Sequence, residues 1–391
     1  MKLGFTAAQE RFRAEVAAWL EAQLSGPFSH LRFHEGMSDK IDERRLWERA
    51  LHDGGWSCIS WPKEYGGRAA TLPEQVIFAE EYVRLGGPGR VNHIGIELCG
   101  PTMLLFGTEQ QKQRFLPPMS RGEELWCQGF SEPGAGSDLA NVRTKARLEN
   151  GEWVIEGQKI WTSFAQFADW GFVVCRTEEG SSGSKGLSYL LVPMRQSGIT
   201  VRPITTMVND QHFCEVFFDG ARTPAENVLG EVGGGWSVAM GTLMFERGAS
   251  TLGQQMTFWY ELGRLIDAAK ANGKYEDGDI RQRIAEAYAG LKIMRYSAMR
   301  MLTNAEQGRM SMEGFTYKLY WASWHRRLGE LAMDVLGAEG ELSDDADYHF
   351  HGLTGTFLHS RADTIYAGTN QIQRNIIAER ALGLPKEPRG K

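Results

Sequence analysis

The sequence of 391 residues predicts an α+β multidomain fold: an N-terminal α-helical domain, a middle β-barrel-like domain and a C-terminal four-helix bundle. Three observations predict this class. Apolar residues recur at helical spacing in the first third, short β-rich runs replace them over about 125–219, and long helical patterns return after Gly233–Gly235. We therefore expect domains at 1–124, 125–232 and 233–391.

Composition and charge argue against several classes of protein. With 43 Lys and Arg against 49 Asp and Glu, the net charge is −6, and the basic excess of a nucleic-acid binder is missing. No apolar stretch approaches the roughly 20 residues of a membrane span, and the N-terminus lacks a secretory signal pattern, so we expect a cytoplasmic protein. The cysteines are scattered and predict reduced core thiols with no metal site: Cys58, Cys99, Cys127, Cys175 and Cys214.

The first third is predicted to be a set of packed helices. Between Thr6 and Leu24, apolar side chains such as Val16 and Leu20 recur on one helical face. Pairs of breakers such as Gly54-Gly55 separate such runs. The further helical runs are expected at 42–54, 73–85, 92–106 and 109–119.

The middle segment is predicted to be a compact β domain. Its clearest signal is a hairpin, because Val142–Leu148 and Trp153–Ile155 flank Asn150-Gly151, a dipeptide that favours tight hairpin turns. A polar surface loop is expected over 179–186, where glycine and serine alternate. Further strands are expected at Phe172–Cys175, Ser188–Val192, Ile199–Ile204 and Cys214–Phe218.

The last third is predicted to form the bundle. Gly383 and Pro385 supply stop signals after the final helical pattern. Long consecutive helices of this kind are typical of a four-helix bundle. The four helices are expected at about 236–272, 279–307, 312–337 and 361–382.

A glycine-rich turn is the first segment that could carry chemistry. It runs Gln128-Gly-Phe-Ser-Glu-Pro-Gly-Ala-Gly-Ser-Asp138 and would expose backbone N–H groups to a planar or phosphorylated ligand. Taken alone, a turn of this composition is more often an ordinary loop of a β domain.

A second segment, Lys159-Ile-Trp-Thr-Ser-Phe164, places a large ring beside two hydroxyl groups at the end of a predicted strand. A core tryptophan, with threonine and serine capping the next turn, is the commoner outcome for such a run. Only the combination with other segments gives it functional meaning.

The third segment runs from Tyr366-Ala-Gly-Thr-Asn-Gln to Arg380. Thr369 or Asn370 is predicted to cap a helix whose N-terminus could receive a phosphate or a ring oxygen. An ordinary capped helix would explain the same residues.

Together the three segments, and the order of the three regions, resemble the acyl-CoA dehydrogenase family over nearly the whole chain. In that family a Ser/Thr-Glu-Pro-x-Ala-Gly-Ser-Asp signature, a Trp-x-Thr/Ser segment and a Gly-Thr-x-x-Ile-Gln segment bind FAD. Ser131–Ser137, Trp161–Ser163 and Gly368–Gln371 match them. The resemblance implies dehydrogenation of an acyl-CoA thioester to a trans-2-enoyl-CoA, with hydride transfer to flavin N5 and an electron-transfer flavoprotein as electron acceptor.

The resemblance also implies roles for individual residues. Ser163 would hydrogen-bond near flavin N5, Ser131 near the flavin pyrimidine, and Trp161 would cover a ring face. The implied FAD-binding residues are Gln128, Phe130, Ser131, Gly136, Ser137, Trp161, Thr162, Ser163, Thr369, Asn370 and Gln371. The implied substrate-binding residues are Ser137, Arg247, Tyr366, Ala367 and Gly368.

The catalytic base is displaced from its usual place. Many family members have a glutamate directly after the tyrosine of the C-terminal segment, where this chain has Ala367, whose methyl group takes no proton. The backbone N–H of Ala367 could still polarise the thioester carbonyl. Glu246 lies where the isovaleryl-CoA, long-chain and several steroid-type branches place their base, and Arg247 matches a family arginine near the CoA.

The surroundings of Glu246 on its helix support this assignment. Thr242, Ser250 and Gly253 fall on the same helical face and are small, which predicts room for an acyl chain. A solvated glutamate paired with an arginine is the plain alternative.

Two departures from the family pattern concern the adenosine end of FAD. Asn272–Asp279 has no clean counterpart of the family's Arg-x-x-Phe-Gly segment, and Asp334–Ala338 is a reduced Gln-x-x-Gly-Gly segment. Branches with such changes include heteromers, so we expect a homo-oligomer or a heteromer with a paralogous subunit. An acyl-CoA oxidase-type flavoprotein and a non-catalytic subunit remain alternatives.

Overall fold

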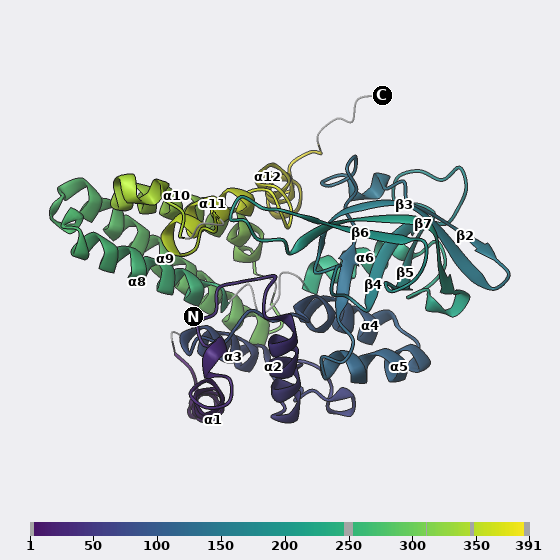
Figure 1. The fold of residues 1–391 in the computed structure, drawn as a ribbon, viewed down its shortest axis with the longest axis horizontal. Coiled ribbons are helices and arrows are strands. Elements are labelled where there is room, and N and C mark those ends of the chain that lie inside the picture. Colours follow the sequence, from purple (N-terminus) through teal and green to yellow (C-terminus); the bar gives the residue numbers. More distant parts are fainter. Residues whose placement is uncertain (1–3, 246–252, 310, 345–347, 387–391) are drawn as a thin grey trace.

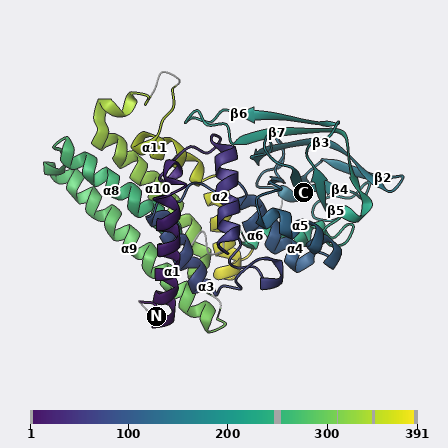
Figure 2. The ribbon, with the colours of Figure 1, turned by 60° about the horizontal axis from the view of Figure 1, so that its bottom comes forward.

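The computed structural model describes residues 4–245, 253–309, 311–344 and 348–386 (Figure 1). It contains N-terminal helices, a twisted seven-stranded sheet and a bundle of long helices. The sheet and the bundle lie at opposite ends of the molecule and the N-terminal helices lie below them in Figure 1, and Figure 2 views them from that side. The predicted fold class is confirmed.

Local capping signals position the N-terminal helices. Thr6 and Thr108 each form a capping box, in which the hydroxyl accepts from a backbone N–H three residues later and a glutamine side chain returns a bond. The segment expected as one helix over 92–106 starts with a π-helical turn, Ile94–Cys99. The helices are α1 (Ala7–Leu24), α2 (Ile41–Asp53), α3 (Leu72–Arg84), α4 (Gly100–Phe106) and α5 (Glu109–Ser120).

A buried polar network joins these helices to the first strand. The Asn92 side chain accepts from the N–H of Trp126 at 3.0 Å and donates to the carbonyl of Met119 at 2.9 Å. The N–H of Asn92 donates to the carboxylate of Glu48, which also pairs with Arg90 at 2.5 Å. The strand therefore starts at a fixed place against the helices.

The middle sheet has the strand order β1-β4-β2-β3-β7-β6, with β5 paired to β4. The expected hairpin joins β2 and β3, and Asn150 and Gly151 both have positive φ, 54° and 85°, as its tight turn requires. The sequence pattern did not indicate that β1 pairs with β4 in parallel. The strands are β1 (Trp126–Gly129), β2 (Lys145–Glu149), β3 (Glu152–Ser163), β4 (Trp170–Arg176), β5 (Leu187–Pro193), β6 (Ile199–Ile204) and β7 (Phe213–Pro224).

The bundle packs around a core of large apolar side chains that includes Phe258, Trp321 and Trp324. Helix α6 stands apart from this core and packs against β5 and α4. No helix in the described part of the chain is long and apolar enough to cross a membrane. The helices are α6 (Gly235–Phe245), α8 (Gln255–Ala271), α9 (Gly278–Glu306), α10 (Glu313–Leu336), α11 (Gly352–Asp363) and α12 (Asn370–Ile376).

Two of the long helices expected in this region differ in the structure. The segment expected over 236–272 is described as α6 and α8, and residues 246–252 between them lie outside the described residues. The single helix expected over 361–382 is wrong. The chain leaves α11 after Asp363 and starts α12 only after Thr369, because Gly368 takes a left-handed φ of 86° and Thr369 provides the next cap.

We predict that Glu48→Gln lowers the free energy of unfolding by about 3–5 kcal/mol in urea titrations, because it leaves the Arg90 guanidinium buried without its counter-charge. The matched control is Glu149→Gln, whose ion pair with Arg147 lies at the surface. The control should leave the free energy of unfolding nearly unchanged, because a surface pair contributes little. Equal effects of the two variants would contradict the prediction.

Candidate functional site

The glycine-rich turn follows directly from β1. Gln128 lies in the strand, and Phe130 is buried against the rings of Phe172 and Tyr189. Beyond it the backbone is open: side chains built on Gly134 or Gly136 would meet no atom within 4 Å. Neither glycine has a left-handed φ, so their smallness serves access to the backbone rather than the turn itself.

A buried ion pair ties this turn to β3. The Lys159 side chain is fully buried and donates to the carboxylate of Glu132 at 2.9 Å and to the carbonyl of Phe130 at 3.0 Å. The same carboxylate accepts from the backbone N–H groups of Arg143 and Thr144. Burial alone would raise the pKa of Glu132, but Lys159 and these N–H groups outweigh it and lower that pKa.

The sequence pattern assigned no role to either residue of this pair. The available signal was a lone lysine inside a strand run beside a turn that carries one glutamate. A buried lysine in a strand needs a counter-charge, and the turn supplies it. The pair explains why the turn and β3 keep a fixed relative position.

The end of β3 carries the second segment. The register with β7 shifts between Lys159 and Thr162, and Trp161 takes a left-handed φ of 60°. Its indole ring is 55% exposed and lies edge-on to Phe213 at 5.8 Å. A strained backbone that holds a large ring in solvent is typical of a ligand surface rather than a core.

The hydroxyl groups beside Trp161 differ in their surroundings. Thr162 is buried, and its Oγ1 has no hydrogen-bond partner in the described part of the chain. Ser163 is half-buried and pairs with Phe213 across the sheet. A buried hydroxyl without a partner is costly and suggests that a bound group completes it.

The third segment forms the loop between α11 and α12. Ala367 and Gly368 both have left-handed φ, 52° and 86°. Thr369 caps α12 by accepting from the N–H of Ile372 at 3.2 Å, as predicted. Asn370 donates to Ser323 on α10 at 3.3 Å, and its buried Oδ1 has no partner among the described residues.

The structure brings the first two segments into direct contact, because the N–H of Ile160 donates to the carbonyl of Ser131 at 2.9 Å. The carbonyl of His212 accepts from Phe164 at the end of the second segment. Burial lowers the pKa of the His359 imidazole on α11; Asp363 opposes this shift, and His325 and then His212 add to it. The third segment therefore belongs to the helices that adjoin this end of the sheet, as Figure 1 shows.

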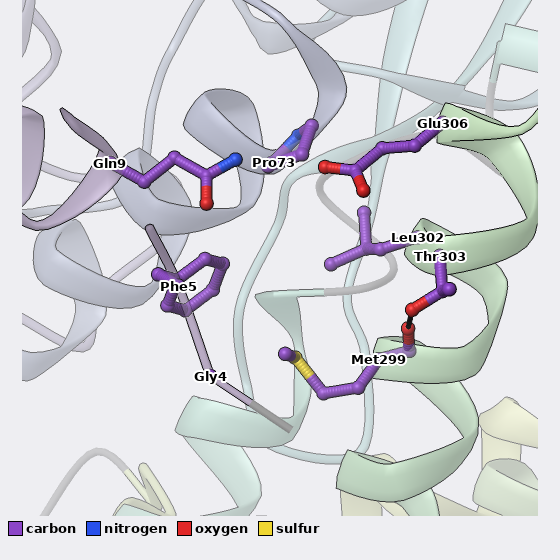
Figure 3. A pocket seen from close by; sticks show the side chains of 8 residues that line it. All are labelled: Gly4, Phe5, Gln9, Pro73, Met299, Leu302, Thr303 and Glu306. Atoms are coloured by element: carbon purple, nitrogen blue, oxygen red, sulfur yellow. Dashed lines mark hydrogen bonds between the residues drawn. The ribbon is translucent and has the colours of Figure 1, made fainter. Parts of the chain in front are cut away.

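The cavities found elsewhere do not include these residues. Figure 3 shows a cavity of about 20 Å³ lined by the start of the chain, α3 and α9, with Phe5, Met299 and Glu306 among its residues. It has room for about one water molecule. A shallower hollow of about 420 Å³ is lined by residues near His34 and by His351. Among the described residues, no group of three or more His, Cys, Asp or Glu could hold a metal ion.

Comparison with known families matches all three regions. The acyl-CoA dehydrogenase N-terminal domain matches residues 6–123, the middle domain 127–221 and the C-terminal domain 233–382. The chain belongs to the acyl-CoA dehydrogenase family. It is accordingly an oxidoreductase of a flavoprotein family of lipid and sterol metabolism.

Individual acyl-CoA dehydrogenases align along the whole chain. The protein named acyl-CoA dehydrogenase IpdE1 of Mycobacterium tuberculosis is 49% identical, covering 97% of this chain and 99% of its own length. The IpdE1 of Mycolicibacterium smegmatis is 48% identical with the same coverage. A solved structure described as the Tcur3481-Tcur3483 steroid ACAD has a TM-score of 0.87 at 29% identity, covering 99% of this chain and all of its own. A chain of the ChsE4-ChsE5 complex from Mycobacterium tuberculosis has a TM-score of 0.82 at 28% identity, with 99% and 100% coverage.

The predicted base and the arginine beside it, Glu246 and Arg247, lie outside the described residues. Helix α6 ends at Phe245, directly before them. Of the small residues expected beside Glu246, Ser250 also lies outside the described residues, and the room for an acyl chain stays a prediction. Thr242 is buried and its hydroxyl contacts Thr102, and a side chain on Gly253 would meet Ala79 at 2.5 Å. These small residues serve close helix packing.

We predict that Glu132→Gln lowers the free energy of unfolding of this acyl-CoA dehydrogenase by about 3–5 kcal/mol at pH 7, because Lys159 stays buried without a counter-charge. Since the folded-state pKa of Glu132 is lowered, its contribution is present above about pH 4.5 and is lost as the pH falls through the folded-state pKa. In urea titrations the difference between wild type and variant should therefore be full at pH 7 and should shrink as the pH falls below 4.5. A constant difference across this range would contradict the prediction.

Proposed function

We propose that the protein catalyses the FAD-dependent α,β-dehydrogenation of an acyl-CoA thioester to a trans-2-enoyl-CoA, with Glu246 removing the α-proton. The observation that carries the proposal is the exposed, strained Trp161, which lies beside the glycine-rich turn in a chain that matches the family throughout. An isolated surface ring would gain nothing from backbone strain, whereas a ligand platform would.

The described residues fit a flavin. Trp161 offers an exposed ring face, Thr162 a buried hydroxyl without a partner, and Gly136 an open backbone approach. When bound, FAD would supply the acceptor for the β-hydrogen as hydride. The residues that would hold it are Gln128, Phe130, Ser131, Gly136, Ser137, Trp161, Thr162, Ser163, Thr369, Asn370 and Gln371.

In this proposal the proton transfer and the polarisation of the thioester come from different elements. Glu246 follows α6 in the chain and would act as general base. The N–H of Ala367 would donate to the thioester oxygen as negative charge develops on it. Ser137, Arg247, Tyr366 and Gly368 would contact the CoA thioester around these two groups.

The acyl group and the partners follow from the relatives as proposals. The Tcur3481-Tcur3483 structure is described as a steroid ACAD, which supports a bulky, steroid-type acyl-CoA as substrate here. The names of this structure and of the ChsE4-ChsE5 complex each give two components, which supports a heteromer with a paralogous subunit over a homo-oligomer. An electron-transfer flavoprotein would reoxidise the reduced cofactor.

The two segments that depart from the family pattern contact each other within this chain. The side chain of Asn272 donates to the carbonyl of Val335 at 2.7 Å, and Arg283 pairs with Asp334 at 2.6 Å. The two segments therefore lie side by side and contact each other. A paralogous subunit would supply the missing contacts to the adenosine end of FAD.

Replacement of the base tests the proposed reaction. Glu246→Gln should retain bound flavin but slow its anaerobic reduction by about 10²–10⁴-fold, because the general base is lost. Reduction is followed at 450 nm in a stopped-flow mixer with isovaleryl-CoA, palmitoyl-CoA and a steroid CoA thioester. Glu231→Gln, an exposed carboxylate before α6, is the matched control and should react as wild type.

Near wild-type reduction by the Glu246→Gln variant would overturn the assignment of the base. Rapid reoxidation of the reduced wild type by O₂, with release of peroxide, would instead favour an acyl-CoA oxidase.

Co-purification tests the partner. We expect the flavin content per chain to rise when the protein is co-expressed with a paralogous acyl-CoA dehydrogenase subunit, because the partner would complete the adenosine site. Absorbance spectra measure the flavin content per chain, and sedimentation measures whether the two chains form a complex. One flavin per chain and full reduction in the isolated protein would contradict a heteromer, and no flavin even in the complex would favour a non-catalytic subunit.

A further inference from the structure

Side chains from three helices form a buried polar chain that ends at Tyr366. His325 of α10 is 4% exposed and contacts one carboxylate through each ring nitrogen. Its Nδ1 lies 2.5 Å from Oδ2 of Asp363 at the end of α11, and its Nε2 lies 2.7 Å from Oε2 of Glu261 on α8. The other carboxylate oxygen of Asp363 accepts from the Tyr366 hydroxyl at 2.8 Å.

The chain is balanced in charge. Burial alone would lower the pKa of His325, but Glu261 and Asp363 outweigh it and raise that pKa to about 10. His325 is therefore an imidazolium at neutral pH. The buried ammonium group of Lys318 on α10 donates to the backbone carbonyl of Asp363 at 2.5 Å. His325 thus lies between two carboxylates, and Lys318 adds a second cation at the backbone of Asp363, which limits the cost of burying these charges.

Helix α10 also holds the loop that follows Asp363. The ring of Tyr366 lies 6.3 Å from that of Trp321 on α10 and 5.7 Å from the Lys318 ammonium group. The amide of Asn370 donates to Ser323 of α10 at the far end of the loop. Helix α10 therefore anchors the loop at both ends.

Ala367 lies between these anchors in an unfavourable conformation. A left-handed φ is strained for a residue with a Cβ, so neighbouring contacts must maintain it. The carbonyl of Ala367 accepts from the Gln373 side chain at 3.2 Å. Among the described residues its N–H has no hydrogen-bond acceptor, so this donor is available to a ligand.

The polar chain offers more than helix packing requires. Apolar residues of similar volume usually pack helices at least as stably as a buried ionic group does. Hydrogen bonds also fix the orientation of these side chains, because they hold Asp363 and Tyr366 at defined distances and angles. Tyr366 directly precedes Ala367 in the chain, so a fixed Tyr366 restricts where the backbone of Ala367 can lie.

We propose that His325 and Asp363 are positioning residues that act through Tyr366 to hold the N–H of Ala367 where the thioester oxygen binds. The inference rests on the proposed dehydrogenation. It adds a chain of four residues, Glu261, His325, Asp363 and Tyr366, that orients the N–H donor. The carboxylates of Glu261 and Asp363 and the imidazole of His325 do not contact the substrate thioester in this proposal.

The mildest test removes one hydroxyl group. In the full-length purified protein, Tyr366→Phe should raise the amide hydrogen-exchange rates of residues 364–369 at least about 10-fold, with the melting temperature nearly unchanged. Tyr320→Phe is the matched control, since it removes a hydroxyl of α10 that donates to the Gly290 carbonyl at 3.4 Å. The control should leave exchange at 364–369 as in wild type.

Stopped-flow reduction supplies the second readout. The probe is whichever of the three acyl-CoA thioesters reduces the flavin of the wild type. Tyr366→Phe and Asp363→Asn should lower the limiting rate of flavin reduction about 10-fold or more. The half-saturating concentration should change far less, because the donor acts mainly as charge develops. Tyr320→Phe should retain both values.

The outcomes separate the two proposals. Unchanged exchange at 364–369 in Tyr366→Phe overturns the positioning role, and this measurement needs no substrate. Faster exchange with an unchanged limiting rate overturns the link to the thioester donor. A wild type that no acyl-CoA reduces would overturn the proposed function, while the exchange result would still decide whether His325 and Asp363 order the loop.

A pH series tests the role of His325 without replacing it, which matters if a His325→Gln variant is too unstable to purify. The charged groups that face it are Glu261 of α8, Asp363 of α11 and Lys318 of α10, with His359 of α11 nearby. Because the folded-state pKa is raised above 6.5, the ordering is complete below that pH and is lost as the pH rises through about 10. Glu261→Gln should move this loss of order, measured by exchange corrected for intrinsic rates, to lower pH. An unshifted profile contradicts the role of His325.

Discussion

The part of the candidate site that the β-sheet carries depends on one buried ion pair, Lys159 with Glu132. Neither charge would be stable in the sheet without the other, so the turn after β1 and the end of β3 are obliged to stay together. The exposed indole of Trp161 and the open backbone near Gly136 keep their positions as a consequence.

The part of the candidate site that the C-terminal helices carry is also held by buried charged side chains. His325 between two carboxylates fixes the end of α11, and the strained loop begins there. In both parts, a buried charge balance lies behind an irregular stretch of backbone with left-handed residues. Such stretches persist only where surrounding contacts determine them. The polar groups therefore specify geometry, and the large apolar clusters of the bundle and the sheet supply the stability.

The sequence predicted the order of the regions, the Asn150-Gly151 hairpin and the Thr369 cap, because each depends on signals a few residues long. It did not predict the parallel pairing of β1 with β4 or the His325 network, whose members are far apart in the chain. The helix expected over 361–382 failed because apolar periodicity continued across a loop that Gly368 and α10 impose. Glu246 is a proposal from the sequence alone, since it lies outside the described residues.

The exposed ring of Trp161 has a consequence for handling the protein. If a flavin covers this ring, then cofactor binding and folding are linked, and free cofactor at a hundred times its dissociation constant would stabilise the folded chain by about 2.7 kcal/mol. Dilution or dialysis would remove that stabilisation and uncover a large aromatic surface at the same time. Loss of cofactor and self-association would then occur together, and the yellow colour of a preparation would report how much of it remains monodisperse.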